Sequence, residues 1–85
     1  MRIWVKVIRE QKIYENVIVE VENLSTYSGI TQAFMDGAEA LKMPTPVITR
    51  TAAQNFFDFN TVRFRPGDFV ESVDLDFLEY EICKE

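Results

Sequence analysis

The residues with the most chemical potential are carboxylates gathered near the C-terminus, in "GDFVESVDLDFLEYEICKE", residues 67–85. Asp74 and Asp76, together with Glu71 or Glu79, offer the oxygen ligands that Ca²⁺ and Mg²⁺ prefer. However, "DLDFLE" lacks the third Asp or Asn and the following Gly of a calcium-binding loop. We therefore interpret these acids as a solvated surface and predict no bound metal. A carboxylate metal site and an acidic mimic of nucleic acid remain distant alternatives.

Other catalytic constellations are missing from the sequence. The chain has no His, and its only cysteine is Cys83. Without His there is no Ser–His or Cys–His nucleophile pair and no ordinary proton shuttle. The three glycines, Gly29, Gly37 and Gly67, are too far apart for a phosphate-binding loop. The sequence therefore predicts that the protein is not an enzyme and needs no cofactor.

The charge balance disfavours nucleic acid and membrane partners. Fourteen acidic and nine basic side chains give a net charge of −5, whereas non-specific binding to phosphates or anionic lipids needs a cationic surface. Arg63, Phe64 and Arg65 interleave charge with an aromatic ring, as single-strand binders do. Because Asp68 and Glu71 follow at once, we expect Phe64 to point inward and both arginines to pair with nearby acids.

Length and hydropathy predict one soluble domain over residues 1–85. The N-terminal stretch "MRIWVKVIRE" is interrupted by charges, so we expect no signal peptide. No segment approaches the roughly 18 apolar residues of a membrane span. These features predict a cytoplasmic location.

The N-terminal residues predict a β-hairpin. Ile3, Val5 and Val7 alternate with polar or aromatic neighbours, and residues 14–21 alternate again with three valines on one side, Val17, Val19 and Val21. The connection, residues 9–12, has no Gly, which disfavours a tight type I′ turn and favours a slightly longer loop.

The second face of this hairpin is not cleanly polar. It carries four apolar or aromatic residues, Trp4, Ile8, Tyr14 and Ile18, beside Arg2, Lys6, Lys12 and Glu20. A sheet that is covered on one side normally shows polar residues on the other. Either another layer covers Trp4, Ile8, Tyr14 and Ile18, or they form an interaction surface for a protein partner or a second copy of the chain.

The middle of the chain predicts an amphipathic helix from Ser28 to Lys42, capped by Ser25 or Ser28. Its apolar residues recur every three or four positions: Tyr27, Ile30, Phe34, Ala38 and Leu41. Gly37 weakens the helix and permits close approach of a strand. Pro44 ends the helix because proline lacks an amide donor.

The segment after this helix is harder to interpret. "PVIT" predicts a short strand that begins at Pro46. Residues 51–59 form either one or two helical turns capped by Thr51, or an aromatic-rich loop. "TVRFR" predicts a further strand with Val62 and Phe64 inward. Six of the seven phenylalanines lie in residues 56–77, and we interpret this cluster mainly as core.

The last segment changes phase within a few residues. Val73, Leu75 and Phe77 are apolar at odd positions, whereas Leu78, Tyr80 and Ile82 are apolar at even ones. One regular strand cannot hold both sets inward. We therefore predict a bulge or bend between Asp74 and Leu78, then a strand from Leu78 to Ile82 whose Glu79 and Glu81 point to water.

Two stretches, "LKMPTPVI" and "FRPGDFVESVDLDFLEYEI", resemble a family of small uncharacterised bacterial proteins. In those proteins a helix runs into a Pro-x-Pro strand, and the chain closes with an acidic and aromatic tail. The resemblance covers mainly the second half of the chain. Its motifs are structural, so it implies no activity and no catalytic residue.

Together these patterns predict an α+β fold of two layers. A mostly antiparallel sheet of four or five strands carries one amphipathic helix on one face, in the order β-β-α-β-(short α or loop)-β-β. A barrel-like all-β closure is the alternative. The function expected is that of a small protein-interaction or structural module without catalysis. The second alternative is a regulatory domain that binds a small ligand in its aromatic-rich half.

Overall fold

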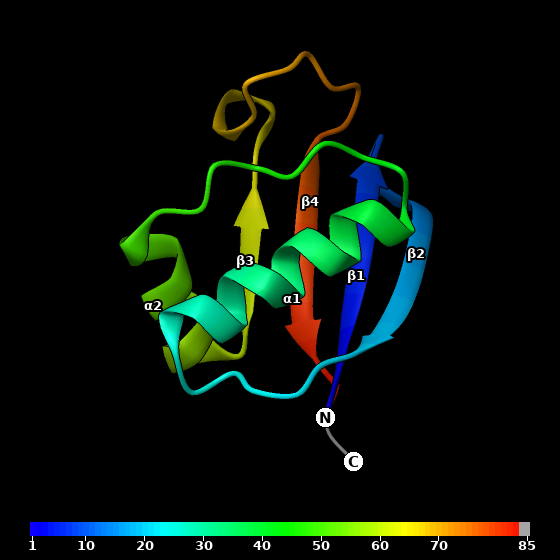
Figure 1. Cartoon of the computed structure of the whole chain (residues 1–85). Coiled ribbons are helices and arrows are strands. Elements are labelled where there is room, and N and C mark those ends of the chain that lie inside the picture. The colour runs from blue at the N-terminus through cyan, green and yellow to red at the C-terminus, as the bar shows by residue number, and fades with distance from the viewer. Residues whose placement is uncertain (84–85) are drawn as a thin grey trace.

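The computed structural model describes residues 1–83 and has an α+β fold. The hairpin β1 (Arg2–Arg9) and β2 (Lys12–Glu20) is followed by α1 (Tyr27–Ala40) and α2 (Arg50–Phe59). The chain then forms β3 (Thr61–Phe64), a 3₁₀ turn η1 (Pro66–Asp68) and β4 (Phe77–Ile82). The four strands form one open antiparallel sheet in the order β2-β1-β4-β3 (Figure 1).

Helix α1 crosses one face of this sheet diagonally (Figure 1). Its inner residues Ile30, Phe34 and Ala38 belong to the buried core, as the spacing predicts. The predicted cap at Ser25 or Ser28 is wrong, because the Thr26 hydroxyl accepts the hydrogen bond from the Gly29 N–H. Ser25 is engaged elsewhere, since its hydroxyl donates to Asn23. The helix ends at Ala40, slightly before the predicted end at Lys42.

The core is built around four aromatic rings from four different elements. Phe34 lies 5.0 Å from Phe56, 5.6 Å from Phe64 and 4.3 Å from Tyr80, measured between ring centroids. Edge-to-face and tilted packing of this kind adds to the stabilisation that comes from area burial. Three members of the phenylalanine cluster do not join the buried core: Phe57 and Phe59 lie on the surface, and half-buried Phe77 lies outside the core.

Two local predictions in the hairpin and after α1 are wrong. The hairpin turn is tight, because Glu10 and Gln11 alone connect the strands, both with positive φ. The Gln11 N–H donates to the Asp76 carboxylate, which supports this turn from a distant segment. The strand predicted from Pro46 does not form. Residues 44–49 are irregular, and in that stretch the Val47 N–H donates to the carbonyl of Asp68, the last residue of η1, rather than to a neighbouring strand.

Residues 51–59 form a helix, which settles the alternative that the sequence left open. Helix α2 begins one residue earlier than expected, and Thr49 rather than Thr51 caps it by accepting from the Ala52 N–H. Asn60 ends the helix in the left-handed conformation, with φ of 63°. This cap turns the chain directly into β3, so α2 lies beside the outer strand of the sheet (Figure 1).

The phase change before β4 is a bend at residues 75–76, after which Leu78 and Tyr80 are fully buried. A second irregularity lies in β2, where Val7 pairs with Glu15 but Ile8 pairs with Ile13. Tyr14 is therefore the extra residue of a β-bulge. Because of this bulge, even-numbered residues after Tyr14 and odd-numbered residues before it point to the same face of β2.

Gly37 provides a test of how closely α1 lies on the sheet. A Cβ at this position would come within 2.7 Å of Val5 Cγ2 and 3.0 Å of Tyr80 Cε1, both on buried side chains. We expect Gly37→Ala to lower the free energy of unfolding by about 1 kcal/mol, because overpacking outweighs the helix propensity gained. Urea denaturation checks this. Gly67→Ala is the control, since nothing lies within 4 Å of its added Cβ; equal stability of the two variants would contradict the packing argument.

Candidate functional site

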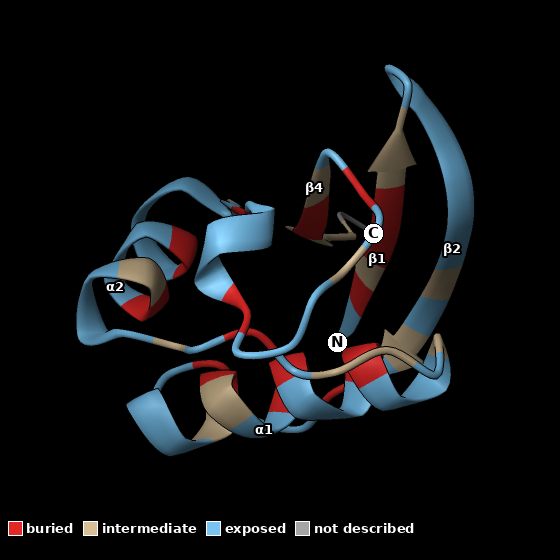
Figure 2. Ribbon diagram, turned by 90° about the horizontal axis from the view of Figure 1, so that it is seen from above, coloured by how far each residue is buried: buried red, intermediate tan, exposed pale blue. Residues whose placement is uncertain are grey.

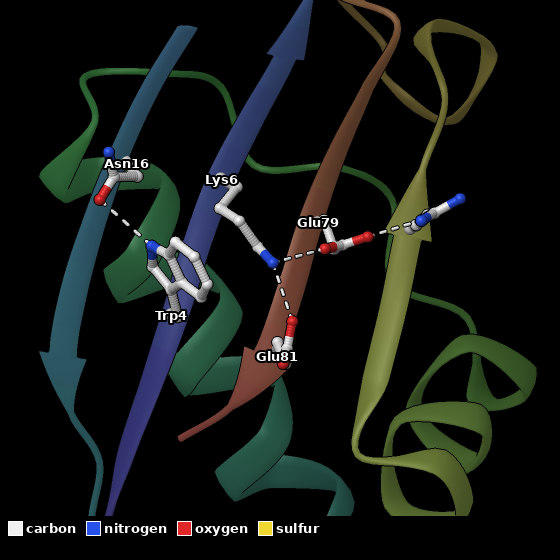
Figure 3. Close-up of polar contacts among 6 residues, drawn as sticks. Trp4, Lys6, Asn16, Glu79 and Glu81 are labelled. Atoms are coloured by element: carbon white, nitrogen blue, oxygen red, sulfur yellow. Dashed lines mark hydrogen bonds and ion pairs between the residues drawn. The ribbon is translucent and has the colours of Figure 1, made fainter. Parts of the chain in front are cut away.

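The side of the sheet opposite α1 is the candidate site, and we call it the open face. The ladder pairs Trp4 with Ile18 and Glu81, Lys6 with Asn16 and Glu79, and Ile8 with Ile13 and Phe77. Residues paired across a ladder share a face, and Figure 3 shows the polar members of this set on the side away from α1. The open face therefore combines apolar side chains with a row of charges.

The structure separates the four residues predicted as an interaction surface: Trp4, Ile8 and Ile18 are paired in the ladder, whereas Tyr14 is not. Trp4 and Ile18 are directly opposite each other, with Ile18 54% exposed. Trp4 also donates from Nε1 to Asn16 Oδ1 at 3.1 Å (Figure 3). Ile8 is opposite Ile13, which is 48% exposed. Tyr14 is the bulge residue, and its ring lies 4.6 Å from the Arg9 guanidinium carbon.

Three of these four residues, Trp4, Ile8 and Ile18, therefore belong to the open face by register. Ile13 joins them, although the sequence pattern did not single it out. Strand β2 is exposed along most of its length (Figure 2). The exposed apolar side chains thus gather at the β2 side of the open face.

A row of four charged side chains crosses the open face from β1 to β3. Lys6 Nζ lies 2.7 Å from Glu79 Oε2 and 2.8 Å from Glu81 Oε1 (Figure 3). Arg63 Nε donates to the other Glu79 oxygen at 2.6 Å. We call Lys6, Glu79, Glu81 and Arg63 the charged row. Its two cations and two anions cancel, so its net charge is zero.

Two members of the charged row are buried, although they lie on the open face. Lys6 is 6% exposed and Glu79 is 8% exposed. The prediction that Glu79 points to water is therefore wrong, while Glu81 keeps a side-chain exposure of 44%. The cause is cover by neighbouring side chains: the Lys6 ammonium lies 4.0 Å from the centre of the Trp4 ring, and Arg63 lies over Phe77.

The protonation of the buried pair follows from its contacts. Burial alone would lower the pKa of Lys6, but the hydrogen bonds to Glu79 and Glu81 outweigh burial and raise this pKa above 10.5. Burial alone would raise the pKa of Glu79, but hydrogen bonds from Lys6 and Arg63 lower it below 4.5. Both groups therefore stay charged at neutral pH, and neither has the pKa of a general acid or base.

The carboxylates that suggested a metal site are dispersed. Asp74 pairs with Arg9, Asp76 accepts from the Gln11 N–H, and Glu79 lies in the charged row. Among residues 1–83, no group of three or more acidic or Cys side chains is placed to hold a metal ion.

A hollow of about 610 Å³ adjoins the charged row. Phe59, Thr61 and Arg63 line it from the β3 side, and Trp4, Glu79 and Glu81 from the centre of the sheet. Cys83 lies at its border and is a half-buried free thiol. Sequence reasoning did not find this arrangement. The available signal was the alternation of Trp4 and Lys6 with Ile3 and Val5, which places a lysine beside an aromatic residue on one strand face.

A scan against protein-family models found no match, and searches of curated proteins and of solved structures found no similar protein either. The resemblance to small bacterial proteins therefore stays a prediction. In the described part of the chain, neither helix is long and apolar enough to cross a membrane.

The buried ion pair should contribute strongly to stability. We expect Lys6→Met to lower the free energy of unfolding by about 3 kcal/mol, because it leaves the buried Glu79 with Arg63 alone. Urea denaturation at neutral pH measures the loss. Arg9→Met, which breaks the exposed pair with Asp74, should cost about 1 kcal/mol or less. Equal losses in the two variants would show that the charged row is no more than a surface ion pair.

The same row predicts how stability depends on pH. Because the pKa of Glu79 is lowered by folding, its contribution is full above pH 4.5 and is lost as the pH falls through the folded-state pKa. Conversely, the contribution of Lys6 is lost only as the pH rises through a value above 10.5. We expect Glu79→Gln to flatten the acid limb of a melting-temperature profile. Glu71→Gln, an exposed acid outside the row, should keep the wild-type limb; loss of the limb in this control would contradict the assignment.

Proposed function

We propose that the protein is a small protein-interaction module without catalytic activity, and that the open face is its contact surface. The observation that carries this proposal is the group of apolar side chains on that face: Trp4, Ile8, Ile13 and Ile18. A few residues at the centre of a contact supply most of its binding energy, and tryptophan is enriched among them. Half-buried Trp4 has a fixed ring, since Asn16 accepts its N–H.

The charge distribution supports the same proposal. The whole chain carries −5, whereas the charged row sums to zero, so the excess acidity lies elsewhere on the molecule. A partner that meets the open face is not repelled by that excess at close range. This holds equally for a second copy of the chain, and a homodimer through the open face is one form of the proposal. The proposal includes a cytoplasmic location for the protein. It also keeps the predicted arrangement of the fold, in which one helix packs on one face of the sheet.

A second candidate function is binding of a small apolar ligand. A hollow of about 350 Å³ is lined by Leu24, Phe56 and Phe57, together with Met1 and Ile82. That volume lies within the range of small-molecule sites. Phe57 is more than half exposed, so this part of the aromatic-rich half has a ring available for contact. We rank it second because two of the four polar residues that line this hollow, Asn23 and Ser25, are already hydrogen-bonded to each other.

Ile18→Glu tests the proposed contact surface. Ile18 is more than half exposed, so we expect the variant to fold, while retention of partners on the immobilised domain falls about tenfold. Retention from a cell lysate is quantified by mass spectrometry, with a tagged second copy of the chain added to report self-association. Val70→Glu is the matched control, because Val70 is 90% exposed and lies outside the sheet. If the two variants and the wild type retain the same proteins equally, the open face is not the contact surface.

A further inference from the structure

The outer edge of β3 carries main-chain groups that point away from the sheet. The Ile82 N–H donates to the Asn60 carbonyl on one side of β4, and the Cys83 N–H donates to the Arg2 carbonyl on the other. Hydrogen-bonded pairs alternate along an antiparallel ladder. Val62 and Phe64, opposite Tyr80 and Leu78, therefore use their main-chain groups on β4.

Thr61 and Arg63 have the opposite orientation along the same strand. Their N–H and C=O groups face outward, where β3 has no neighbouring strand in the described part of the sheet (Figure 1). The edge thus presents two main-chain donors and two main-chain acceptors, with the regular spacing that pairing with a further β-strand requires.

Side chains shape a groove along this edge. A hollow of about 450 Å³ lies between α2 and β3, where Asn55 and Phe59 come from the helix and Thr61, Val62 and Arg63 from the strand. Phe59 is 69% exposed and lines both this hollow and the larger one on the open face. An edge strand beside a helix is an arrangement that binds extended peptides, because the edge pairs with the main chain and the groove contacts alternate side chains.

The edge of β2 is a poorer template, although it is longer. Its bulge at Tyr14 interrupts the regular spacing of outward main-chain groups, and bulges are a device that discourages pairing at sheet edges. By the same alternation, its regular part presents Asn16, Ile18 and Glu20 outward, one residue more than β3, so the preference for β3 rests on its unbroken register and on the groove beside it. Strand β3 has no bulge, and its register with β4 is continuous over all four residues.

We propose that the β3 edge binds an extended segment of a partner protein as a fifth strand, with an aliphatic or aromatic side chain of that segment against Phe59. The partner chemistry follows from the groove: regular main-chain donors and acceptors for Thr61 and Arg63, and an apolar side chain for the exposed ring. Because the protein as a whole carries −5, long-range attraction favours a segment flanked by basic residues over an acidic one, although the edge itself carries the exposed Arg63 side chain. This inference rests on the proposed interaction function but uses the sheet edge, not the open face.

Amide hydrogen exchange with synthetic peptides tests the proposal. The probes are three acetylated and amidated hexapeptides: Lys-Thr-Val-Thr-Val-Lys, Lys-Thr-Ile-Thr-Ile-Lys and Lys-Thr-Phe-Thr-Val-Lys. In the free protein, the amides of Thr61 and Arg63 should exchange faster than those of Val62 and Phe64. At least one peptide should slow exchange at Thr61 and Arg63 by about tenfold, as expected for newly hydrogen-bonded amides. No slowing with any of the three, or slowing confined to β2, would overturn the proposal.

Two controls separate strand pairing from non-specific contact. The same peptide with its four central residues N-methylated has no central donor and should lose the protection; an equal effect would show that only side chains bind. Arg63→Pro removes one outward donor and leaves the β4 ladder intact, so it should weaken binding about tenfold relative to Arg63→Ala, which removes the same side chain but keeps the donor.

If Arg63→Pro does not fold, the N-methylated peptide alone decides between strand pairing and side-chain contact. If the peptides fail while Ile18→Glu still changes partner retention, the edge inference is wrong and the open-face function stands. If Ile18→Glu changes nothing while the peptides protect Thr61 and Arg63, the edge is the contact surface instead.

Discussion

The structure depends on strand β4. Its adjacent residues Glu79 and Tyr80 point to opposite faces of the sheet and bond to different parts of the chain. The Tyr80 hydroxyl is buried and donates to the Phe34 carbonyl at 2.9 Å, which joins α1 to the middle of the sheet. Burial raises the pKa of this hydroxyl, so it remains a donor at any ordinary pH. Glu79, the preceding residue, points the other way and bonds to Lys6 of β1 and Arg63 of β3. Two adjacent side chains thus connect three strands and a helix.

This arrangement explains why such a small domain tolerates the buried charges of Lys6 and Glu79. A lone carboxylate with the exposure of Glu79 would be costly to desolvate. Here both of its oxygens are engaged by cations on neighbouring strands, so the cost is offset by charge-assisted hydrogen bonds. Lys6 is compensated in the same way by two carboxylates and the Trp4 ring. The row can form only in the order β1-β4-β3, so it also specifies which strands are neighbours.

The elements that local periodicity determines were predictable, whereas features that depend on distant partners were not. The apolar spacing of Ile30, Phe34 and Ala38 predicts α1, and the phase change near Leu78 predicts the break before β4. The alternation also correctly places Glu79 and Tyr80 on opposite faces of β4. It does not reveal that Glu79 is buried, because the side chains that cover it come from β1 and β3. The tight turn at Glu10 and Gln11 escaped prediction for the same reason, since its support comes from Asp76.

The Tyr14 bulge shows why the candidate contact surface was only partly predictable. A uniform period of two places Tyr14 with Trp4 and Ile18, but one extra residue in β2 reverses the phase and brings Ile13 to the open face instead. The bulge also makes the two edges of the sheet unequal, since the β2 edge becomes irregular while that of β3 stays regular. Arg63 lies where the two proposed surfaces meet: its side chain ends the charged row, and its main-chain groups face the β3 edge. A strand added at that edge would therefore lie directly beside the neutral row and the exposed Phe59 ring. In that arrangement the edge would supply main-chain pairing and Phe59 the apolar contact, whereas the apolar contact residues proposed on the open face lie on β1 and β2, away from this edge.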